Sequence, residues 1–186
     1  MRILICGDSF AADWRVAYPD SQGWPTLLER DFDVTNRAQA GACEYRIWQQ
    51  IKAADQTRFD HVIVSHTNPY RLYVREHPVH RESLLHQNCD LLYSDAVDHG
   101  LDTVREYFEK YFDLDYARDI QCLVMNEIQR TMRLPVTHIA HFDVSAPPGF
   151  PLLDFSSSWQ SHRGLINHYD QTGNHEVYKH LLDVLK

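Results

Sequence analysis

The tetrapeptide Gly7-Asp8-Ser9-Phe10 places a serine directly after the first apolar run of the chain, RILIC (2–6). This run has the length and composition of a strand buried in a parallel sheet, and Gly7 permits a sharp turn at its end. There the Ser9 hydroxyl is expected to project past the sheet edge, beside the N–H groups of a helix terminus. A hydroxyl near such donors is half of an acyl-transfer site. The same four residues also fit an ordinary turn at a strand end.

Two further residues that can donate hydrogen bonds to an oxyanion follow predicted strands. Gly41 lies five residues after Asn36, and a glycine there lets the backbone approach a ligand and present its N–H. Asn68 follows the apolar run 61–66 and precedes Pro69, which favours an extended conformation and directs the carboxamide past the strand end. Gly41 could equally be an ordinary loop glycine, and Asn68 could equally form an Asx turn.

A histidine suited to general-base catalysis, His168, lies just before the predicted C-terminal helix 171–185. A loop histidine at this place is available to a serine elsewhere in the fold. Asp170 stands directly before the helix and is suited to its N-cap.

The elements that must position these residues alternate along the chain. The apolar patterns predict strands at 2–6, 32–36, 61–66 and 136–142, and helices at 24–32, 43–54, 171–185 and, as a pair joined near Leu114-Asp115, within 102–132. Strands alternating with helices predict βαβ units and a three-layer α/β/α sandwich around a parallel sheet. In such sheets the active crevice lies beyond the carboxyl ends of the strands.

Residues 70–100 interrupt this alternation, because they show no sustained period and are rich in histidine. We expect an insertion on the side of the crevice, suited to a lid or to substrate recognition. Several of its side chains belong to types that bind zinc, but their spacing matches no common structural zinc pattern, and we expect a solvated surface and no metal or other cofactor. They are His77, His80, His86, Cys89 and Asp90.

Aromatic residues recur through the segment 107–116. Such stripes usually mark a helix face packed on a sheet, and the alternative is the lining of a substrate pocket or an oligomer contact. The residues are Tyr107, Phe108, Tyr111, Phe112 and Tyr116.

Length and composition indicate a single folded domain, residues 1–186, with the insertion inside it. A net charge of −8 argues against a nucleic-acid partner, because binding to phosphate backbones rests on clustered Lys and Arg. The N-terminus resembles no signal peptide and no apolar run is long enough to span a bilayer, so we expect a cytoplasmic protein. Its four dispersed cysteines are expected to be free thiols.

Taken together, four stretches resemble the blocks of the SGNH hydrolases, the GDSL-type esterase and lipase superfamily, in family order and across nearly the whole chain. GDSF matches the first block, Asn36 and Gly41 the second, Asn68 in HTNP the third, and the segment from His168 the last. The resemblance implies a flavodoxin-like fold and a metal-free serine mechanism. By similarity, Ser9 is acylated with His168 as base and then acid. The oxyanion hole is implied to consist of the Ser9 and Gly41 N–H groups and the Asn68 side chain.

The chain departs from the family pattern in two places. The acid that normally stands three residues before the histidine is replaced by Leu165, and the third block has His66 and Pro69 in place of its glycine and aspartate. The group that orients His168 therefore stays open, and the candidates are Asp154, Asp170 and a backbone carbonyl, the last leaving a Ser–His dyad.

The resulting hypothesis is an esterase or deacetylase that cleaves a carboxylic ester of a small alcohol, sugar or lipid through an acyl-enzyme. An O-acyltransferase is an alternative, because water and an acceptor alcohol use the same base. The departures at Leu165 and in the third block also fit a binding or structural protein that keeps the fold with weakened catalysis.

Overall fold

The computed structural model describes residues 1–142, 144–165 and 168–186 of the chain. Its centre is a five-stranded parallel sheet in the order β2-β1-β3-β4-β5, which is the flavodoxin-like order. The predicted α/β fold is therefore confirmed. The strands are β1 (Arg2–Gly7), β2 (Asp33–Asn36), β3 (His61–Ser65), β4 (Val136–Ala140) and β5 (Leu152–Asp154).

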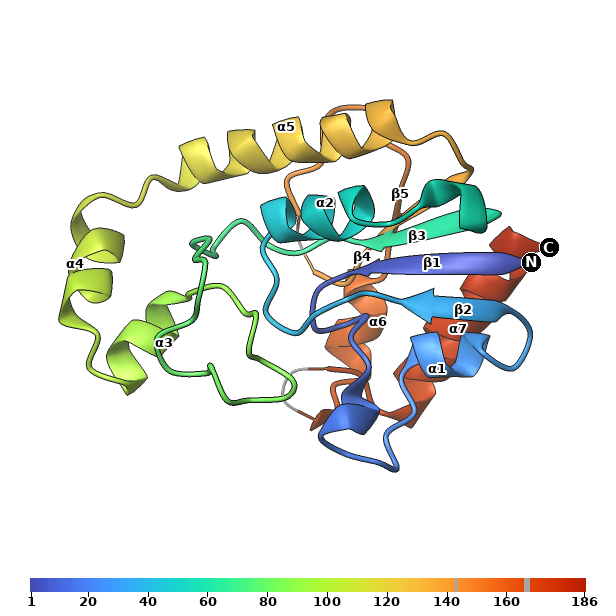
Figure 1. Cartoon of the computed structure of the whole chain (residues 1–186), viewed down its shortest axis with the longest axis horizontal. Coiled ribbons are helices and arrows are strands. Elements are labelled where there is room, and N and C mark those ends of the chain that lie inside the picture. The colour runs from blue at the N-terminus through green and yellow to red at the C-terminus, as the bar shows by residue number, and fades with distance from the viewer. Residues whose placement is uncertain (143, 166–167) are drawn as a thin grey trace.

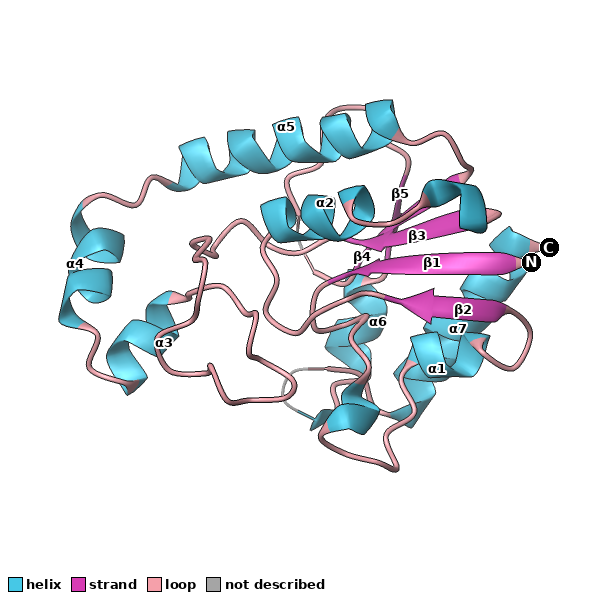
Figure 2. Cartoon of the chain, viewed as in Figure 1, coloured by secondary structure: helices cyan, strands magenta, loops and turns pink. Residues whose placement is uncertain are grey.

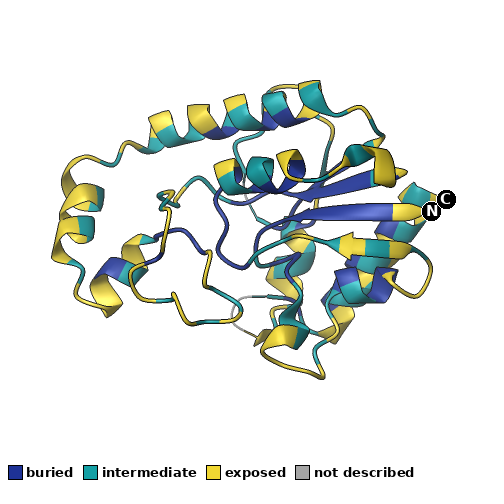
Figure 3. Cartoon of the chain, in the orientation of Figure 1, coloured by how far each residue is buried: buried dark blue, intermediate teal, exposed yellow. Residues whose placement is uncertain are grey.

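The central strands bury both faces, because successive side chains point to opposite sides of a strand. In β1, Ile3 and Ile5 belong to one core cluster, whereas Leu4 and Cys6 belong to the other. Because one cluster covers each face of the sheet, side chains on both faces of β1 are apolar, and the strand is a continuous apolar run in the sequence. Figure 3 shows β1 and β3 as a buried centre between more exposed helices.

Helices cover the sheet on both sides, as Figures 1 and 2 show. One layer consists of α1 (Trp24–Leu28), α6 (Ser156–Ser161) and α7 (Gln171–Leu185), and the other of α2 (Glu44–Lys52) and α5 (Leu114–Thr131). Short 3₁₀ turns lie at Trp14–Val16 and Gln56–Arg58. The Asp170 side chain accepts a hydrogen bond from Gly173 N and caps α7, as predicted.

Three short elements were absent from the sequence prediction: β5, α6 and α3 (Tyr93–Asp98). Each has six residues or fewer, so none displays a full period of its pattern. The joint between the two long helices lies at 111–113, with Asp113 as the N-cap of α5.

The segment beyond the carboxyl ends of β1 and β3 forms a lobe that contains α3 and α4 (Asp102–Lys110) (Figure 1). The aromatic segment 107–116 lies partly in this lobe, and the expectation that it packs on the sheet is wrong. Helix α4 buries none of its residues, and Tyr111 and Tyr116 are 70% and 67% exposed. The reason is tertiary: α4 packs on α3 at the sheet edge instead of on a sheet face.

All four cysteines are free, and three of them are buried. Within the described parts of the chain, no helix combines the length and apolarity that crossing a bilayer requires.

Candidate active site

A cavity of about 510 Å³ lies at the carboxyl edge of the sheet, between β1, β3 and the insertion. Four residues that the sequence singled out line it together: Ser9, Gly41, Asn68 and His168. They come from four segments far apart in the chain. A hydroxyl, an imidazole, an amide and a glycine backbone facing one cavity are the groups that acyl transfer requires.

Gly7 is required by the close approach of β3. A Cβ at Gly7 would lie 2.6 Å from the Cβ of Ser65, so no larger residue fits. The buried Gln50 amide accepts from Gly7 N at 2.8 Å and donates to Gly7 O at 3.1 Å, which holds the strand end in place. Its φ is not positive, so its role is packing and not, as the sequence suggested, freedom to turn.

Ser9 is followed by a turn, in which Ala11 N donates to Asp8 O, and not by an α-helix. The expected helix-terminal N–H groups are therefore replaced by those of a tight turn. The loop is fixed by Trp14, whose indole N–H donates to the Ser9 carbonyl at 2.7 Å.

Asp8 is fully buried beneath this turn, where its Oδ1 accepts from Phe10 N at 3.1 Å. Burial raises the pKa of its carboxyl to about 6, and the positive charge of Arg71 opposes this shift. The folded protein therefore holds the Asp8 proton more tightly than the unfolded chain does. Stability from this group is present at low pH and is lost as the pH rises from about 4 to about 6.

Asp8→Asn is expected to remove this pH dependence while it keeps an oxygen for Phe10 N. From pH 4 to pH 7, the free energy of unfolding of the variant should rise relative to wild type by about 2–3 kcal/mol. Urea denaturation of both proteins at pH 4 and at pH 7 measures these free energies of unfolding. The titration of all other groups contributes equally to the two proteins and cancels when the variant is compared with wild type. If the free energy of unfolding changed with pH by the same amount in both proteins, the raised pKa of Asp8 would be contradicted.

Gly41 adopts φ +76°, a left-handed conformation that favours glycine. A Cβ there would lie 2.4 Å from the Cβ of Cys89, and the Gly41 carbonyl accepts from Asp90 N at 2.9 Å. The glycine therefore brings the backbone against the insertion at the cavity wall. Asn36, five residues earlier, holds the adjacent loop by donating to Ala11 O at 2.7 Å.

Asn68 lies just past β3, and its Oδ1 accepts from Tyr70 N at 3.3 Å in an Asx turn. The turn occupies the amide oxygen and leaves the amide N–H₂ as the donor. The preceding residue, Thr67, is held on both sides, because its N–H donates to Glu44 Oε2 at 3.3 Å and its carbonyl accepts from the Gln121 amide.

A buried polar chain supports this loop from behind. Glu44 Oε1 lies 2.6 Å from His66 Nδ1, His66 Nε2 lies 2.8 Å from His138 Nδ1, and His138 Nε2 lies 2.8 Å from Gln129 Oε1. Burial, with repulsion by His66 as a lesser cause, lowers the pKa of His138 to about 3, so its ring is neutral at physiological pH. The departure at His66 in the third block thus has a structural partner in Glu44.

The His168 imidazole packs against two aromatic rings, with centroids 4.6 Å from Phe10 and 4.5 Å from Trp14. Its Nδ1 lies 3.2 Å from the carbonyl oxygen of Leu165. Leu165 is the residue that replaces the acid of the family pattern, and a backbone carbonyl was one of the three orienting groups that the sequence left open. A neutral ring that donates from Nδ1 has its lone pair on Nε2.

The two candidate acids lie elsewhere. Asp154 accepts from Ser156 N at 2.8 Å at the start of α6, and Asp170 caps α7 with its Oδ2 3.7 Å from His162 Nδ1. Among the described residues, the lining of the Ser9 cavity includes neither carboxylate.

The histidine-rich insertion contributes His80, His86, Cys89 and Asp90 to the cavity lining. Its expected solvation is wrong for three residues, His77, Cys89 and Asp90, which are at most 4% exposed. Side-chain ligand atoms of His77, His80 and Cys89 lie within 4.8 Å of one another. However, His77 Nδ1 accepts from Val79 N and His80 N, so a neutral ring carries its hydrogen on Nε2, 3.5 Å from Asp95 Oδ2. These contacts fit a histidine–carboxylate cluster better than a metal site.

Sequence reasoning missed several residues at this site because their signal is tertiary. Trp14 and Trp159 both line the cavity. Arg71 lines it as well, from a segment with no period. Glu44 and Gln50 look like ordinary residues of an amphipathic helix, and nothing in their spacing shows that they reach the ends of β1 and β3.

No protein-family model matches the sequence, and no curated protein matches it. Among solved structures, the chain is similar to a proposed lipolytic protein of the G-D-S-L family from Desulfitobacterium hafniense DCB-2, at 13% sequence identity and a TM-score of 0.32. The similarity covers 74% of this chain and 76% of the other chain.

Proposed function

We propose that the protein is a serine hydrolase that cleaves carboxylic esters, with Ser9 as the nucleophile and His168 as the general base. The observation that carries the proposal is the shared cavity of about 510 Å³, which Ser9, Gly41, Asn68 and His168 line together. The parallel sheet brings the loops that carry Ser9, Gly41 and Asn68 to one edge, and the loop before α7 adds His168 to the same cavity.

In the proposed mechanism, Ser9 Oγ attacks the ester carbonyl carbon while its proton passes to His168 Nε2. The Ser9 N–H, the Gly41 N–H and the Asn68 amide stabilise the oxyanion. Collapse of this intermediate transfers the proton from His168 to the departing alcohol and leaves Ser9 acylated. Water then attacks the acyl-enzyme with His168 as base, which releases the acid and restores the serine.

The contact between His168 Nδ1 and the Leu165 carbonyl supports a dyad. A carboxylate in this place holds the correct tautomer and also stabilises the imidazolium. A neutral carbonyl oxygen also holds the correct tautomer, but it stabilises the imidazolium less than a carboxylate does. Asp154 and Asp170 remain the alternative orienting groups, and their substitution is a direct test.

Asn68→Ala is expected to lower kcat by about 10²–10³-fold with KM little changed, because the amide acts on the oxyanion and not on the ground-state ester. Steady-state hydrolysis of 4-nitrophenyl acetate measures both constants. The control is Asn88→Ala, an exposed residue beside a separate cavity, which should leave them unchanged. An increase in KM with kcat unchanged would show that Asn68 does not act in the oxyanion hole.

The experiment that tests the function is labelling of Ser9 by a fluorophosphonate probe together with turnover of short 4-nitrophenyl esters. Labelling with release of acid supports the hydrolase, whereas labelling with transfer of the acyl group to an added alcohol supports the O-acyltransferase. Absence of both at neutral pH would favour a binding or structural protein that has lost catalysis.

A further inference from the structure

Arg71 lies at the junction of two cavities. It lines the Ser9 cavity and also a second cavity of about 320 Å³, and Asn68 likewise lines both. Its Nη1 lies 3.5 Å from the position that a Cβ on Gly41 would occupy. The guanidinium therefore stands beside the proposed oxyanion hole.

This guanidinium has no hydrogen bond or ion pair with any residue that the structure describes, and its Nε is fully buried without a partner. Two of the neighbouring carboxylates are engaged elsewhere. Asp90 binds Arg46 at 2.7 Å and accepts from Cys43 N, and Asp95 accepts from Leu92 N. Arg71 acts on Asp8 only by its charge.

A half-buried cation without a hydrogen-bonded partner is unfavourable, because it loses hydration, and the Asp8 carboxyl attracts Arg71 by charge alone without a hydrogen bond or ion pair. An anionic ligand removes this cost, and the planar fork of a guanidinium matches the paired oxygens of a carboxylate or phosphate. In a chain of net charge −8, an unpaired arginine inside a cavity indicates a specific anion site.

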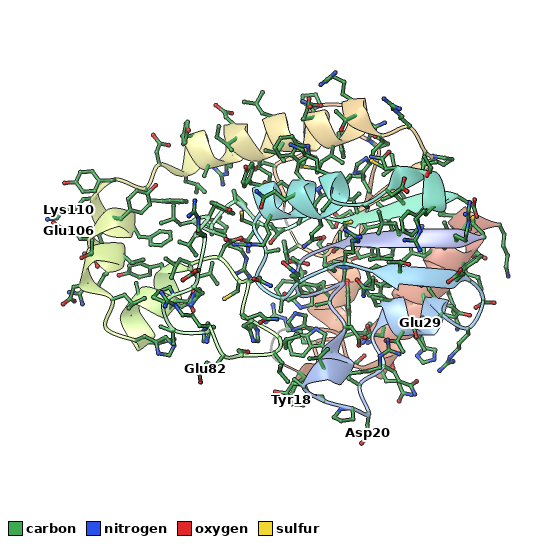
Figure 4. All side chains as sticks on the ribbon, in the orientation of Figure 1. Tyr18, Asp20, Glu29, Glu82, Glu106 and Lys110 are labelled. Carbon is green, nitrogen blue, oxygen red and sulfur yellow. The ribbon has the colours of Figure 1, made fainter. Side chains whose placement is uncertain are left out.

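The second cavity indicates what lies next to that anion. Helix α4, the following loop, α5, α2 and the insertion all contribute rings to it, and the charged Glu106 and Lys110 lie on the outer side of α4 (Figure 4). Tyrosine rings offer flat apolar faces with polar edges, which suit a ring-shaped or apolar group. The aromatic lining consists of Tyr45, Tyr73, Tyr107, Tyr111, Phe112 and Tyr116.

We infer that Arg71 is the specificity-determining residue for an ester that bears an anionic group, carboxylate or phosphate, close to the scissile bond. A ring or apolar portion of the same substrate occupies the tyrosine-lined cavity. This inference rests on the proposed esterase function, since it assigns the substrate class of that site.

Three acetate esters of similar size test the inference: 3-acetoxybenzoate, 3-acetoxyphenyl phosphate and the neutral 3-acetoxybenzamide. We expect wild type to prefer at least one of the two anionic esters over the amide by about 10- to 100-fold in kcat/KM, the range of a charge-assisted hydrogen-bond pair. The anion preferred distinguishes a carboxylate site from a phosphate site.

In Arg71→Gln, the ratio of kcat/KM for the anionic ester to kcat/KM for the amide should fall close to one, chiefly because KM for the anionic ester rises. Arg71→Lys should keep part of this preference, because lysine retains the positive charge but lacks the planar guanidinium. Arg37→Gln, in a separate cavity, is the matched control and should keep the wild-type ratio. Absence of a preference in wild type would overturn the inference. So would an equal loss by Arg71→Gln on all three esters.

A second measurement does not depend on turnover. Calorimetric titration of Ser9→Ala with benzoate and with inorganic phosphate should show binding of at least one anion that Ser9→Ala/Arg71→Gln lacks, and equal binding by both proteins would overturn the inference. Thermal melting of both confirms that they are folded. If no ester is hydrolysed and Ser9 is not labelled, but the anion still binds through Arg71, the hydrolase proposal fails and the anion site stands.

Discussion

Ser9→Ala is expected to lower kcat/KM for 4-nitrophenyl acetate by about 10⁴–10⁶-fold, because Ser9 supplies the one hydroxyl side chain among the described residues that line the cavity. Its melting temperature should stay close to wild type, since the half-exposed Ser9 side chain contributes little packing. Esterase kinetics, fluorophosphonate labelling and thermal melting give the three readings.

The matched control is Ser157→Ala, an exposed serine on α6, which should keep full activity and full labelling. A chelator such as EDTA should leave wild-type turnover unchanged, because the mechanism uses no metal. Loss of turnover on chelation would instead indicate a metal at the cluster of His77, His80 and Cys89, of which His80 and Cys89 line the cavity. Turnover by Ser9→Ala near the wild-type rate would exclude the acyl-enzyme.

His168→Ala is expected to lower kcat by about 10⁴-fold or more, because the Ser9 hydroxyl then lacks a base at neutral pH. The half-buried His175, whose Nδ1 faces Gln171 O on α7, provides the control, and His175→Ala should be as active as wild type. Full activity of His168→Ala would show that the base has been misassigned.

Asp154→Asn and Asp170→Asn extend this test to the orienting group. If the Leu165 carbonyl holds the ring, as its 3.2 Å contact with Nδ1 suggests, both variants should stay near the wild-type rate. Asp170→Asn should also keep its stability, because asparagine is as good an N-cap as aspartate. A selective loss of kcat in either variant would assign that carboxylate as the orienting group.

The main strands and the two helical layers followed from local patterns, whereas the flavodoxin-like order of the strands was expected only from the resemblance. Runs such as RILIC are apolar at every position because both faces of β1 are covered, and that state is visible in a single segment. Elements of three to six residues, such as β5 and α6, carry too few positions to show a period. The tyrosines of α4 and α5 had the spacing of a packed helix face, but their position beyond the sheet edge leaves them to line a cavity.

The sequence by itself determined the α/β class, the positions of four of the five described strands to within two residues, and the four residues that face one cavity. Chain-local periodicity and the order of short motifs carry that information. Only the tertiary structure decided that a backbone carbonyl stands beside His168, that Glu44 holds His66, and that Arg71 lies unpaired at the junction of two cavities. A carbonyl has no residue-specific signature, and the pairing or isolation of a charge depends on which distant segments fold against it.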